Sequence, residues 1–295
     1  MKNVLGIDIG GTNTKWGIIS ENGEVLVHES IPTKSELGFD DFIERIKNVC
    51  SPAIRDYNVD SIGIGAPNTS SVSGMIERAV NLRWPDLNLR DEFKKAFNLN
   101  VFVENDANIS AVGEYLFGTA KDCSDFIVLT IGTGIGTGIY SGHHLVRGHN
   151  GMGAEGGHIT IDSNGRKCPC GGIGHLEAYV GIKGIKKSFF EKLDKEFSFA
   201  EILDLYKKND PEANDVINLT AEYLAKGLVE MQTLFLPKKI ILGGGGALLG
   251  QRFVDSVSMR MKEYSYAPFV GKTQICLSSI SIENGAIIGA ASLCF

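Results

Sequence analysis

Residues 155–177, EGGHITIDSNGRKCPCGGIGHLE, combine two histidines, two cysteines and two glutamates with many glycines. Neutral imidazole and thiolate are the ligands that zinc prefers, and a structural zinc site takes four of them. His158, Cys168, Cys170 and His175 supply that number. The glycines let the backbone turn sharply and approach closely. The stretch therefore predicts a structural zinc site, and it leaves the glutamate at each end for another role.

A glycine turn near the N-terminus has the residues to bind phosphate. Asp8 ends a short apolar run, and Gly10, Gly11 and Thr12 follow it. Exposed backbone N–H groups in such a turn cradle phosphate oxygens, and the aspartate can hold a magnesium ion through water. An ordinary hairpin turn beside a buried aspartate is the alternative. A second glycine–threonine turn at 132–134 favours phosphate binding, because two facing turns could clamp a polyphosphate from both sides.

A third run of glycines, at 243–246, follows an apolar run at 240–242. Glycine allows the backbone to approach a flat ring closely, and it equally allows a tight corner between a strand and a helix. Both interpretations stay open at this position.

The sequence ENDAN at 104–108 follows a predicted strand and opens a predicted helix. The N–H groups and dipole at a helix start keep an aspartate ionised, as a base for a hydroxyl proton must be. Asp106 could therefore be a general base, although a helix cap is the alternative. Asn105 beside it adds a polar group with no evident helix-forming advantage. Asn81, with Trp84 close by, offers a further amide in a loop.

Apolar spacing predicts strands that alternate with helices along the chain. A meander of three strands over 4–31 opens the sequence, and a similar hairpin restarts at 126–140 around the second glycine turn. The other predicted elements are strands at 61–65, 101–104, 239–242 and 275–277 and helices at 39–53, 91–97, from 106, 184–193, 199–207, 211–235, 253–264 and 284–293. Such alternation predicts an α/β fold. The restart suggests an internal duplication into two α/β halves that share a cleft.

Composition sets the broad class of the protein. The 295 residues are 43% hydrophobic and 22% charged, which is typical of a soluble globular protein. The net charge of −6 argues against a broad nucleic-acid or anionic-membrane surface. A signal peptide and a membrane span of ~20 apolar residues are both missing from the sequence, so we expect a cytoplasmic protein. Its cysteines are then reduced thiols or metal ligands rather than disulfides.

Six motifs in register resemble the ROK family, which groups bacterial sugar kinases with related repressors. They are DIGGT at 8–12, ENDAN at 104–108, IGTGIG at 131–136, EGGH at 155–158, CPCG at 168–171 and LGGG at 242–245. The resemblance implies two ribonuclease-H-like domains of the hexokinase/actin-like ATPase superfold with a cleft between them. We expect a smaller α/β domain at 1–105, joined by a C-terminal helix at 283–295, and a larger one at 106–282 with the zinc loop at 155–177.

The resemblance also implies roles for individual residues. Asp106 would be the general base that takes the proton from the 6-hydroxyl of the sugar. The sugar-binding residues would be Gly65, Asn81, Asn105, Asp106, Glu155, His158 and Glu177. ATP and Mg²⁺ would be bound by Asp8, Gly10, Gly11, Thr12, Lys15, Gly132, Thr133, Gly134, Gly243, Gly244 and Gly245. The two glutamates left over by the zinc site would thus bind sugar.

The zinc site departs from the family pattern at one position. The family usually has a cysteine where this chain has His175. Imidazole is a good zinc ligand, so we expect a site of two histidines and two cysteines. In the alternative, His175 points elsewhere and the site is weaker or completed by water.

The resemblance implies an ATP-dependent kinase that phosphorylates the 6-hydroxyl of a hexose, with glucose the first substrate expected. N-acetylmannosamine kinase, or another hexose or N-acetylhexosamine kinase, is the alternative within the class. A sugar-responsive repressor would carry a DNA-binding domain of roughly 80 residues ahead of the kinase-like part, and the phosphate turn here begins at residue 8. A catalytically dead sugar-binding module would lack Asp8 or Asp106, and both are present. Kinship further suggests a homodimer.

Overall fold

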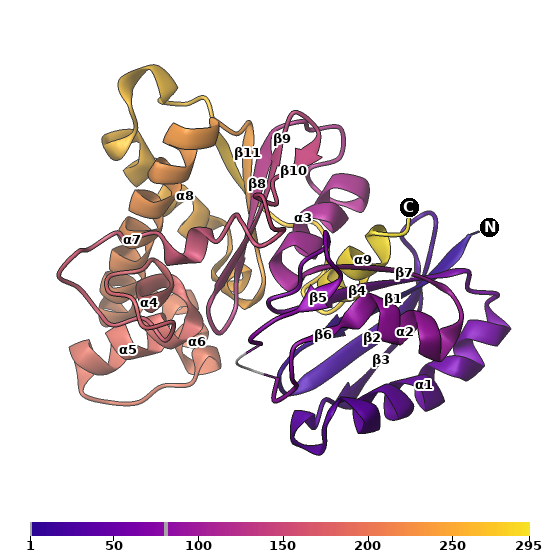
Figure 1. Ribbon diagram of the computed structural model, residues 1–295. Coiled ribbons are helices and arrows are strands. Elements are labelled where there is room, and N and C mark those ends of the chain that lie inside the picture. The colour runs from indigo at the N-terminus through magenta and orange to yellow at the C-terminus, as the bar shows by residue number, and fades with distance from the viewer. Residues whose placement is uncertain (1, 80–81) are drawn as a thin grey trace. The chain divides into compact units, whose positions relative to one another are not determined.

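Two sheets with the same strand order form the frame of the protein, as the computed structural model shows for residues 2–79 and 82–295 (Figure 1). The first sheet runs in the order β3-β2-β1-β4-β7 and the second in the order β10-β9-β8-β11-β12. In each sheet the second and third strands pair antiparallel, and the third, fourth and fifth pair in parallel. This shared topology is what the repeated hairpin in the sequence predicts.

The contacts between residues group the chain into two compact units. Unit 1 comprises residues 1–122, 145–154 and 279–295, and unit 2 comprises residues 123–144 and 155–278. The C-terminal segment therefore groups with the N-terminal sheet. The helix that starts at Asp106 also groups with unit 1, so the boundary predicted between residues 105 and 106 lies inside this unit.

Among its described residues, unit 1 contains one five-stranded sheet, a small hairpin and four α-helices. The sheet strands are β1 (Asn3–Ile9), β2 (Asn13–Ser20), β3 (Val25–Pro32), β4 (Ser61–Ala66) and β7 (Asn100–Asn105). The hairpin pairs β5 (Met75–Ile76) with β6 (Leu87–Asn88). The helices are α1 (Phe39–Asp56), α2 (Leu89–Phe97), α3 (Asp106–Phe117) and α9 (Gly285–Ser292), with a 3-10 turn at Ser35–Leu37.

The two faces of the first sheet are covered differently. Alternate residues of β1, among them Leu5 and Ile7, pack with α1 and α2 in one core, while Val4 packs with α9 on the other face (Figure 1). On the α9 side the strands carry glycine. A Cβ at Gly6 would lie 2.2 Å from the carbonyl oxygen of Ile287, so only glycine lets α9 approach this closely.

Unit 2 repeats the sheet and adds a larger helical layer. Its strands are β8 (Phe126–Ile131), β9 (Ile135–Ser141), β10 (His144–Leu145), β11 (Lys239–Gly243) and β12 (Gln274–Leu277). Its helices are α4 (Glu177–Val180), α5 (Ile182–Leu193), α6 (Phe199–Lys207), α7 (Pro211–Phe235) and α8 (Gly250–Tyr264), with 3-10 turns at Gly156–His158, Gly245–Leu249 and Ala267–Phe269. α7 buries an apolar stripe that includes Ile217, Ala221, Leu224 and Leu228, and it packs beside α8.

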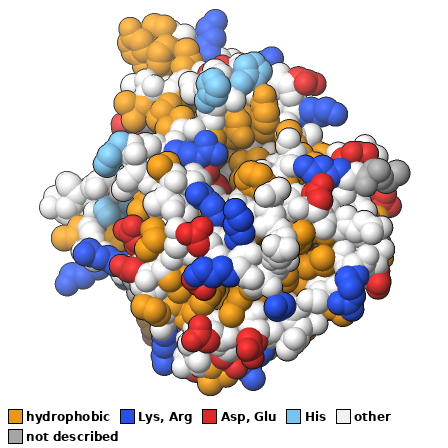
Figure 2. All heavy atoms as spheres, turned by 45° about the vertical axis from the view of Figure 1, so that its right-hand side comes forward, with side chains coloured by type: hydrophobic (Ala, Val, Ile, Leu, Met, Phe, Trp, Pro, Cys, Tyr) orange, Lys and Arg blue, Asp and Glu red, His pale blue; other side chains and the backbone are white. Residues whose placement is uncertain are grey.

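The predicted α/β class is confirmed, and the longer elements lie within a few residues of their predicted bounds. The four-residue helix α4 and the two-residue strands were not predicted, because such short elements carry no readable periodicity. Across the part of the chain that the structure describes, no helix combines the length and apolar character needed to cross a membrane. On the face drawn in Figure 2, lysine and arginine side chains are interspersed with aspartate and glutamate.

Candidate active site and metal centre

Three parallel strands of unit 1 end at one edge of the sheet, and predicted site residues stand there in a row. Asp8 on β1 pairs opposite Gly65 on β4, which in turn pairs opposite Glu104 on β7. α3 begins directly after β7, so Asn105 and Asp106 follow at the same edge. The carboxyl ends of parallel strands are where open α/β sheets bind ligands. Strand pairing thus brings together residues that lie nearly a hundred positions apart in the sequence.

Asn105, rather than Asp106, caps helix α3. The side-chain oxygen of Asn105 accepts hydrogen bonds from the N–H groups of Ala107 at 2.9 Å and Asn108 at 3.4 Å. The expectation that Asn105 has no helix-forming advantage was therefore wrong, because an asparagine at this position satisfies the first free N–H groups of the helix. The alternative role of Asp106 as the cap is filled by its neighbour.

Asp106 stands at the first position of α3 with its side chain exposed. Its Oδ1 accepts a hydrogen bond from the N–H of Ala107 at 3.0 Å. Loss of solvent around the carboxylate raises the pKa of Asp106, and the N–H of Ala107 opposes the shift. A carboxylate whose pKa is raised is a stronger base than a free aspartate, as proton abstraction from a hydroxyl requires.

Asp8 sits opposite Lys15 across the β1–β2 pair. Loss of solvent, together with the nearby charge of Asp106, raises the pKa of Asp8 to about 7, and Lys15 lowers it. Ionised Asp8 is therefore costly beside a second carboxylate. A divalent cation would offset that cost, so the carboxylates of Asp8 and Asp106 fit the oxygen ligands that Mg²⁺ prefers, directly or through water.

The turn between β1 and β2 is closed by backbone and side-chain hydrogen bonds. The N–H of Gly10 donates to the carbonyl oxygen of Asn13 at 3.1 Å, and the hydroxyl of Thr33 donates to the carbonyl oxygen of Gly10 at 2.6 Å. Gly11 and Thr12 are exposed at the tip. The structure thus holds the turn in one shape and presents its tip to solvent. Asn81, the remaining residue predicted for this half, lies outside the described residues.

The corresponding turn in unit 2, Gly132–Thr133–Gly134, is braced by Glu177 at the start of α4. The N–H of Ile135 donates to Glu177 Oε2 at 2.9 Å. A Cβ at Gly134 would lie 2.1 Å from the same oxygen, so any larger residue there would displace the Glu177 carboxylate. The carboxylate of Glu177, which was predicted to bind sugar, thus also supports the predicted phosphate turn.

The third glycine run lies beside the second turn. Gly243 at the end of β11 pairs opposite Thr130, two residues before the turn. Gly244 has a φ of +71°, and a Cβ there would lie 2.8 Å from the carbonyl oxygen of Ile131. Gly245 begins the 3-10 turn that leads into α8. The two glycine runs of unit 2 therefore form adjacent backbone surfaces at the carboxyl ends of β8 and β11.

The four predicted zinc ligands come together. One ligand atom from each of His158, Cys168, Cys170 and His175 lies within 4.8 Å of all the others. The Sγ of Cys168 is 3.9 Å from Nδ1 of His158, and the Sγ of Cys170 is 3.1 Å from Nδ1 of His175. Zinc bonds of ~2.0–2.3 Å place tetrahedral ligands roughly 3.3–3.8 Å apart, which these spacings approach. His175 thus points into the cluster, and the donor set fits zinc.

Glu155 and His158 frame the 3-10 turn Gly156–His158, which lies against β9. The N–H of Gly156 donates to the hydroxyl of Thr137 at 2.7 Å, and the N–H of His158 donates to the carbonyl oxygen of Glu155 at 3.0 Å. Glu155 is exposed. Because Nδ1 of His158 faces Cys168, Nε2 is the nitrogen directed away from that thiol.

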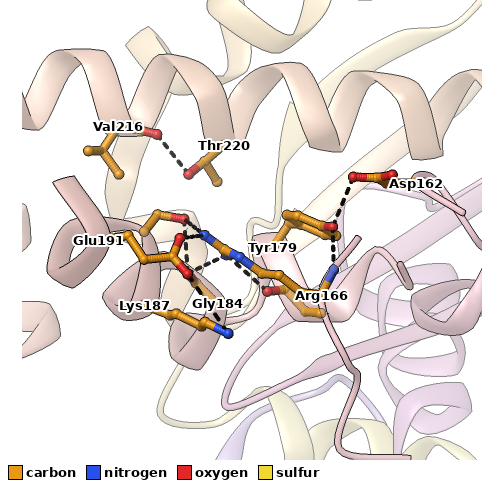
Figure 3. A network of polar contacts seen from close by, with 10 residues as sticks. Asp162, Arg166, Tyr179, Gly184, Lys187, Glu191, Val216 and Thr220 are labelled. Atoms are coloured by element: carbon orange, nitrogen blue, oxygen red, sulfur yellow. Dashed lines mark hydrogen bonds and ion pairs between the residues drawn. The ribbon is translucent and has the colours of Figure 1, made fainter. Parts of the chain in front are cut away.

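An arginine that the sequence analysis missed anchors the zinc loop to the helices beneath it (Figure 3). The guanidinium of Arg166 donates to the carbonyl oxygens of Ala178 and Gly184, each at 3.2 Å, and it contacts Glu191. Its centre lies 4.9 Å from the ring of Tyr179, whose hydroxyl accepts from the Arg166 N–H at 2.8 Å. The loop is thus tied to α4 and α5 by bonds independent of the metal.

The zinc cluster and the braced turn share one residue. The Sγ of Cys168 lies 3.6 Å from Glu177 Oε1, while Glu177 Oε2 accepts from Ile135. Glu177 therefore bridges the metal cluster and the predicted phosphate turn. Nothing in the local sequence pattern indicates this bridge, because Glu177 and Ile135 are 42 residues apart.

Comparisons with known proteins agree with these motifs. A sequence profile of the ROK family matches residues 4–295. The glucokinase of Thermotoga maritima is 30% identical to this chain, over 98% of this chain and 96% of that protein. The xylose repressor of Bacillus spizizenii is 31% identical, over 98% of this chain and 76% of the repressor.

A solved structure shares the fold. The ROK family glucokinase from Streptomyces griseus, in complex with glucose and AMPPNP, superposes with a TM-score of 0.86 at 27% identity, over 99% of this chain and 98% of that chain. The prediction of an actin-like ATPase fold is confirmed by this match. With a profile that spans nearly the whole sequence, this chain belongs to the ROK family.

Proposed function

We propose that this protein is an ATP-dependent sugar kinase that transfers a phosphoryl group to the 6-hydroxyl of a hexose, with glucose the preferred substrate. The observation that carries the proposal is the start of α3, where Asn105 caps the helix and leaves Asp106 exposed with a raised pKa. A similar chain that is a glucokinase and a similar structure that holds glucose and a nucleotide analogue support it.

Asp106 acts as the general base. It accepts the proton of the sugar 6-hydroxyl as the oxygen attacks the γ-phosphorus, so the bond to the β–γ bridging oxygen breaks and ADP leaves. Phosphoryl transfer needs positioning and charge stabilisation more than covalent help from the protein. Sugar hydroxyls are bound by Asn105, Glu155 and His158, since each buried hydroxyl needs a hydrogen-bond partner.

The nucleotide is held by glycine turns in both units. Gly10, Gly11 and Thr12 bind the γ-phosphate through backbone N–H groups, and Lys15 adds a positive charge. The turn at 132–134 holds the inner phosphates, and the adjacent run at 243–245 packs against adenosine. Asp8 would hold Mg²⁺, which would neutralise charge on the phosphates.

Zinc has a structural role in this proposal. His158, Cys168, Cys170 and His175 would hold it, and it would supply folding free energy to the loop rather than chemistry to the reaction. Through Glu177 the loop supports the turn at 132–134. A zinc ion held by His158 would also fix the orientation of this proposed sugar ligand.

A coupled assay of ADP release over hexoses and N-acetylhexosamines tests the proposal. Glucose should give the highest kcat/KM, and the product should be the 6-phosphate by ³¹P NMR. N-acetylmannosamine as the best substrate would establish the alternative substrate class and retain the mechanism. Parallel reactions with inorganic polyphosphate identify the phosphate donor. If no sugar in the panel stimulated ATP consumption, the proposal would fail.

A further inference from the structure

An ion pair with one buried partner lies at the end of the strand that precedes the proposed base, and its Arg147 side chain is 40% exposed. The carboxylate of Glu104, at the end of β7, is 0% exposed, and its Oε2 accepts a hydrogen bond from Nε of Arg147 at 2.6 Å. Arg147 comes from residues 145–154, a segment that packs in unit 1 although the chain before and after it belongs to unit 2. The pair therefore joins an inserted segment to the strand that precedes α3.

The other oxygen of Glu104 holds the start of α3 on both sides of the base. Glu104 Oε1 accepts from the backbone N–H of Asn105 at 3.0 Å and from the side-chain amide of Asn108 at 3.1 Å. Asp106 lies between these two donors in the sequence. One buried carboxylate thus fixes the capping residue, the first turn of the helix and the inserted segment together.

A second contact ties the same segment to unit 1. The hydroxyl of Ser70 donates to the carbonyl oxygen of Asn150 at 2.6 Å. Gly151 packs against Ser70 with a φ of +84°, and a Cβ there would lie 2.8 Å from the hydroxyl oxygen. This contact does not involve Glu104, so it allows docking of the segment to be separated from support of the helix start.

Arg147 is the charged partner of the buried Glu104 carboxylate. Removal of one partner from a buried ion pair leaves an uncompensated charge, which is strongly destabilising, whereas replacement of both partners by neutral groups is often tolerated. Without Arg147 the buried carboxylate loses its partner and turns toward water. That movement weakens its hydrogen bonds from Asn105 and Asn108, and the helix start loosens.

We propose that the Glu104–Arg147 pair is a latch that positions Asp106 for proton abstraction. Both are positioning residues, since they act through Asn105 and Asn108 rather than on the substrate. The kinetic tests of this inference rest on the proposed function. The tests by hydrogen exchange do not depend on it. The latch also fixes the segment that leads into Glu155, a proposed sugar ligand.

Arg147→Gln, Arg147→Lys, Glu104→Gln and the double variant E104Q/R147Q test the latch. Arg147→Gln should lower kcat about 100-fold, the effect of a misplacement of roughly 1 Å, with the KM for ATP unchanged. Arg147→Lys should recover part of this loss, because lysine restores the charge without the planar fork. The double variant should be more active than Arg147→Gln, because it no longer buries an unpaired charge.

Hydrogen exchange of backbone amides tests the latch without any measurement of activity. In Arg147→Gln, faster exchange is expected in residues 145–154 and in the first turn of α3, and not in α7 of unit 2. Ser70→Ala should speed exchange in the segment alone and leave kcat near wild type. Lys226→Gln, which removes a half-buried ion pair of 2.7 Å to Glu222 on α7, is the control for loss of any ion pair.

Two results would overturn the latch. One is an Arg147→Gln protein with wild-type kcat and exchange. The other is a double variant that is no more active than Arg147→Gln and has a raised KM for the sugar or for ATP. That result would mean that Arg147 contacts a substrate. If Arg147→Gln does not fold, the same measurements are made on the double variant. Its kcat should then be below that of wild type and its hydrogen exchange faster. If no variant and no wild-type protein has kinase activity, exchange alone decides the latch and the proposed function fails separately.

Discussion

The two glycine turns occupy equivalent places in their sheets but have different surroundings. Beside the first turn, Asp8 and Lys15 face each other across the hairpin, whereas the equivalent pair beside the second is Thr130 and Gly136. Charge is therefore present at the first turn and missing from the paired positions at the second. In the proposed function, a shared backbone frame serves two different tasks, charge chemistry in unit 1 and neutral binding in unit 2.

Support for the turns differs as well. The first turn is held by hydroxyl groups, since Thr33 donates to Gly10 and lies 3.0 Å from the hydroxyl of Thr14. The second is held by the carboxylate of Glu177, which also contacts the metal cluster. Substitutions at the first turn should therefore lower the catalytic rate. Substitutions at the second turn should mainly lower local stability.

The largest effect is expected from Asp8→Asn. Loss of the carboxylate removes the ligand proposed for Mg²⁺, and charge stabilisation by a metal is worth several kcal/mol in a transition state. At 1.36 kcal/mol for each factor of ten, kcat should fall roughly 10³-fold. Steady-state kinetics at saturating Mg²⁺ measure this, with Asp56→Asn at the exposed end of α1 as the control.

The same variant should be more stable than wild type at high pH. Burial and Asp106 raise the pKa of Asp8 in the folded state to about 7, above the ordinary aspartate value of 3.8. The folded protein therefore holds this proton more tightly, and the resulting stability is lost as pH rises from 3.8 to 7. The advantage of Asp8→Asn in thermal denaturation should grow over this range and then level off. A variant less stable than wild type at pH 8 would contradict the shift.

Zinc removal should lower the stability of the fold more than it lowers kcat. Purified protein should contain about one zinc per chain, and Cys168→Ser should lose it. Because structural zinc contributes directly to folding, Tm should fall by about 2–4 °C for each kcal/mol lost. Cys276→Ser on β12, outside the cluster, is the matched control. A zinc content clearly below one per chain in protein purified without added metal would contradict the site.

Substitutions of two glycines in the second turn should differ in their effect on the free energy of unfolding. Gly134→Ala places a Cβ against Glu177, and such overpacking costs about 1–3 kcal/mol. A Cβ at Gly132 meets nothing within 4 Å, so Gly132→Ala should leave the free energy of unfolding nearly unchanged. Chemical denaturation of both variants measures the difference. Equal stability would mean that Glu177 does not brace the turn.

The smallest change expected is a shift in the pH profile. The base must be ionised, and loss of solvent around its carboxylate raises the pKa of Asp106 above 3.8. The kcat/KM should therefore fall as pH falls, with a midpoint above that of an ordinary aspartate. An acid limb at or below pH 3.8, measured against a pH-independent coupling system, would remove the support for a tuned base.

Local sequence patterns predicted the frame and many of the site residues. The hairpins around residues 10 and 132 were predicted because glycine turns interrupt apolar runs, and the four zinc ligands because their types are specific to that metal. The long helix at 211–235 was predicted from its 3.6-residue spacing, and its bounds match α7.

Contacts between distant segments could not be predicted in this way. Arg147 and Glu104 are 43 residues apart, and neither is marked by periodicity or by a turn signal. Gly6 of β1 and Gly63 of β4 were assigned no role, because the helix that packs against them, α9, lies at the other end of the chain. Short-range patterns thus predict elements, whereas pairing and close approach depend on the whole fold.

The kcat of Asp106→Asn tests the central claim most directly, since the fold and the cap by Asn105 should survive this change. We expect kcat on glucose and ATP to fall about 10²–10⁴-fold, the range for loss of a general base, with little change in the KM for ATP. A near-normal kcat for Asp106→Asn, in a protein with wild-type Tm, would contradict the proposed mechanism.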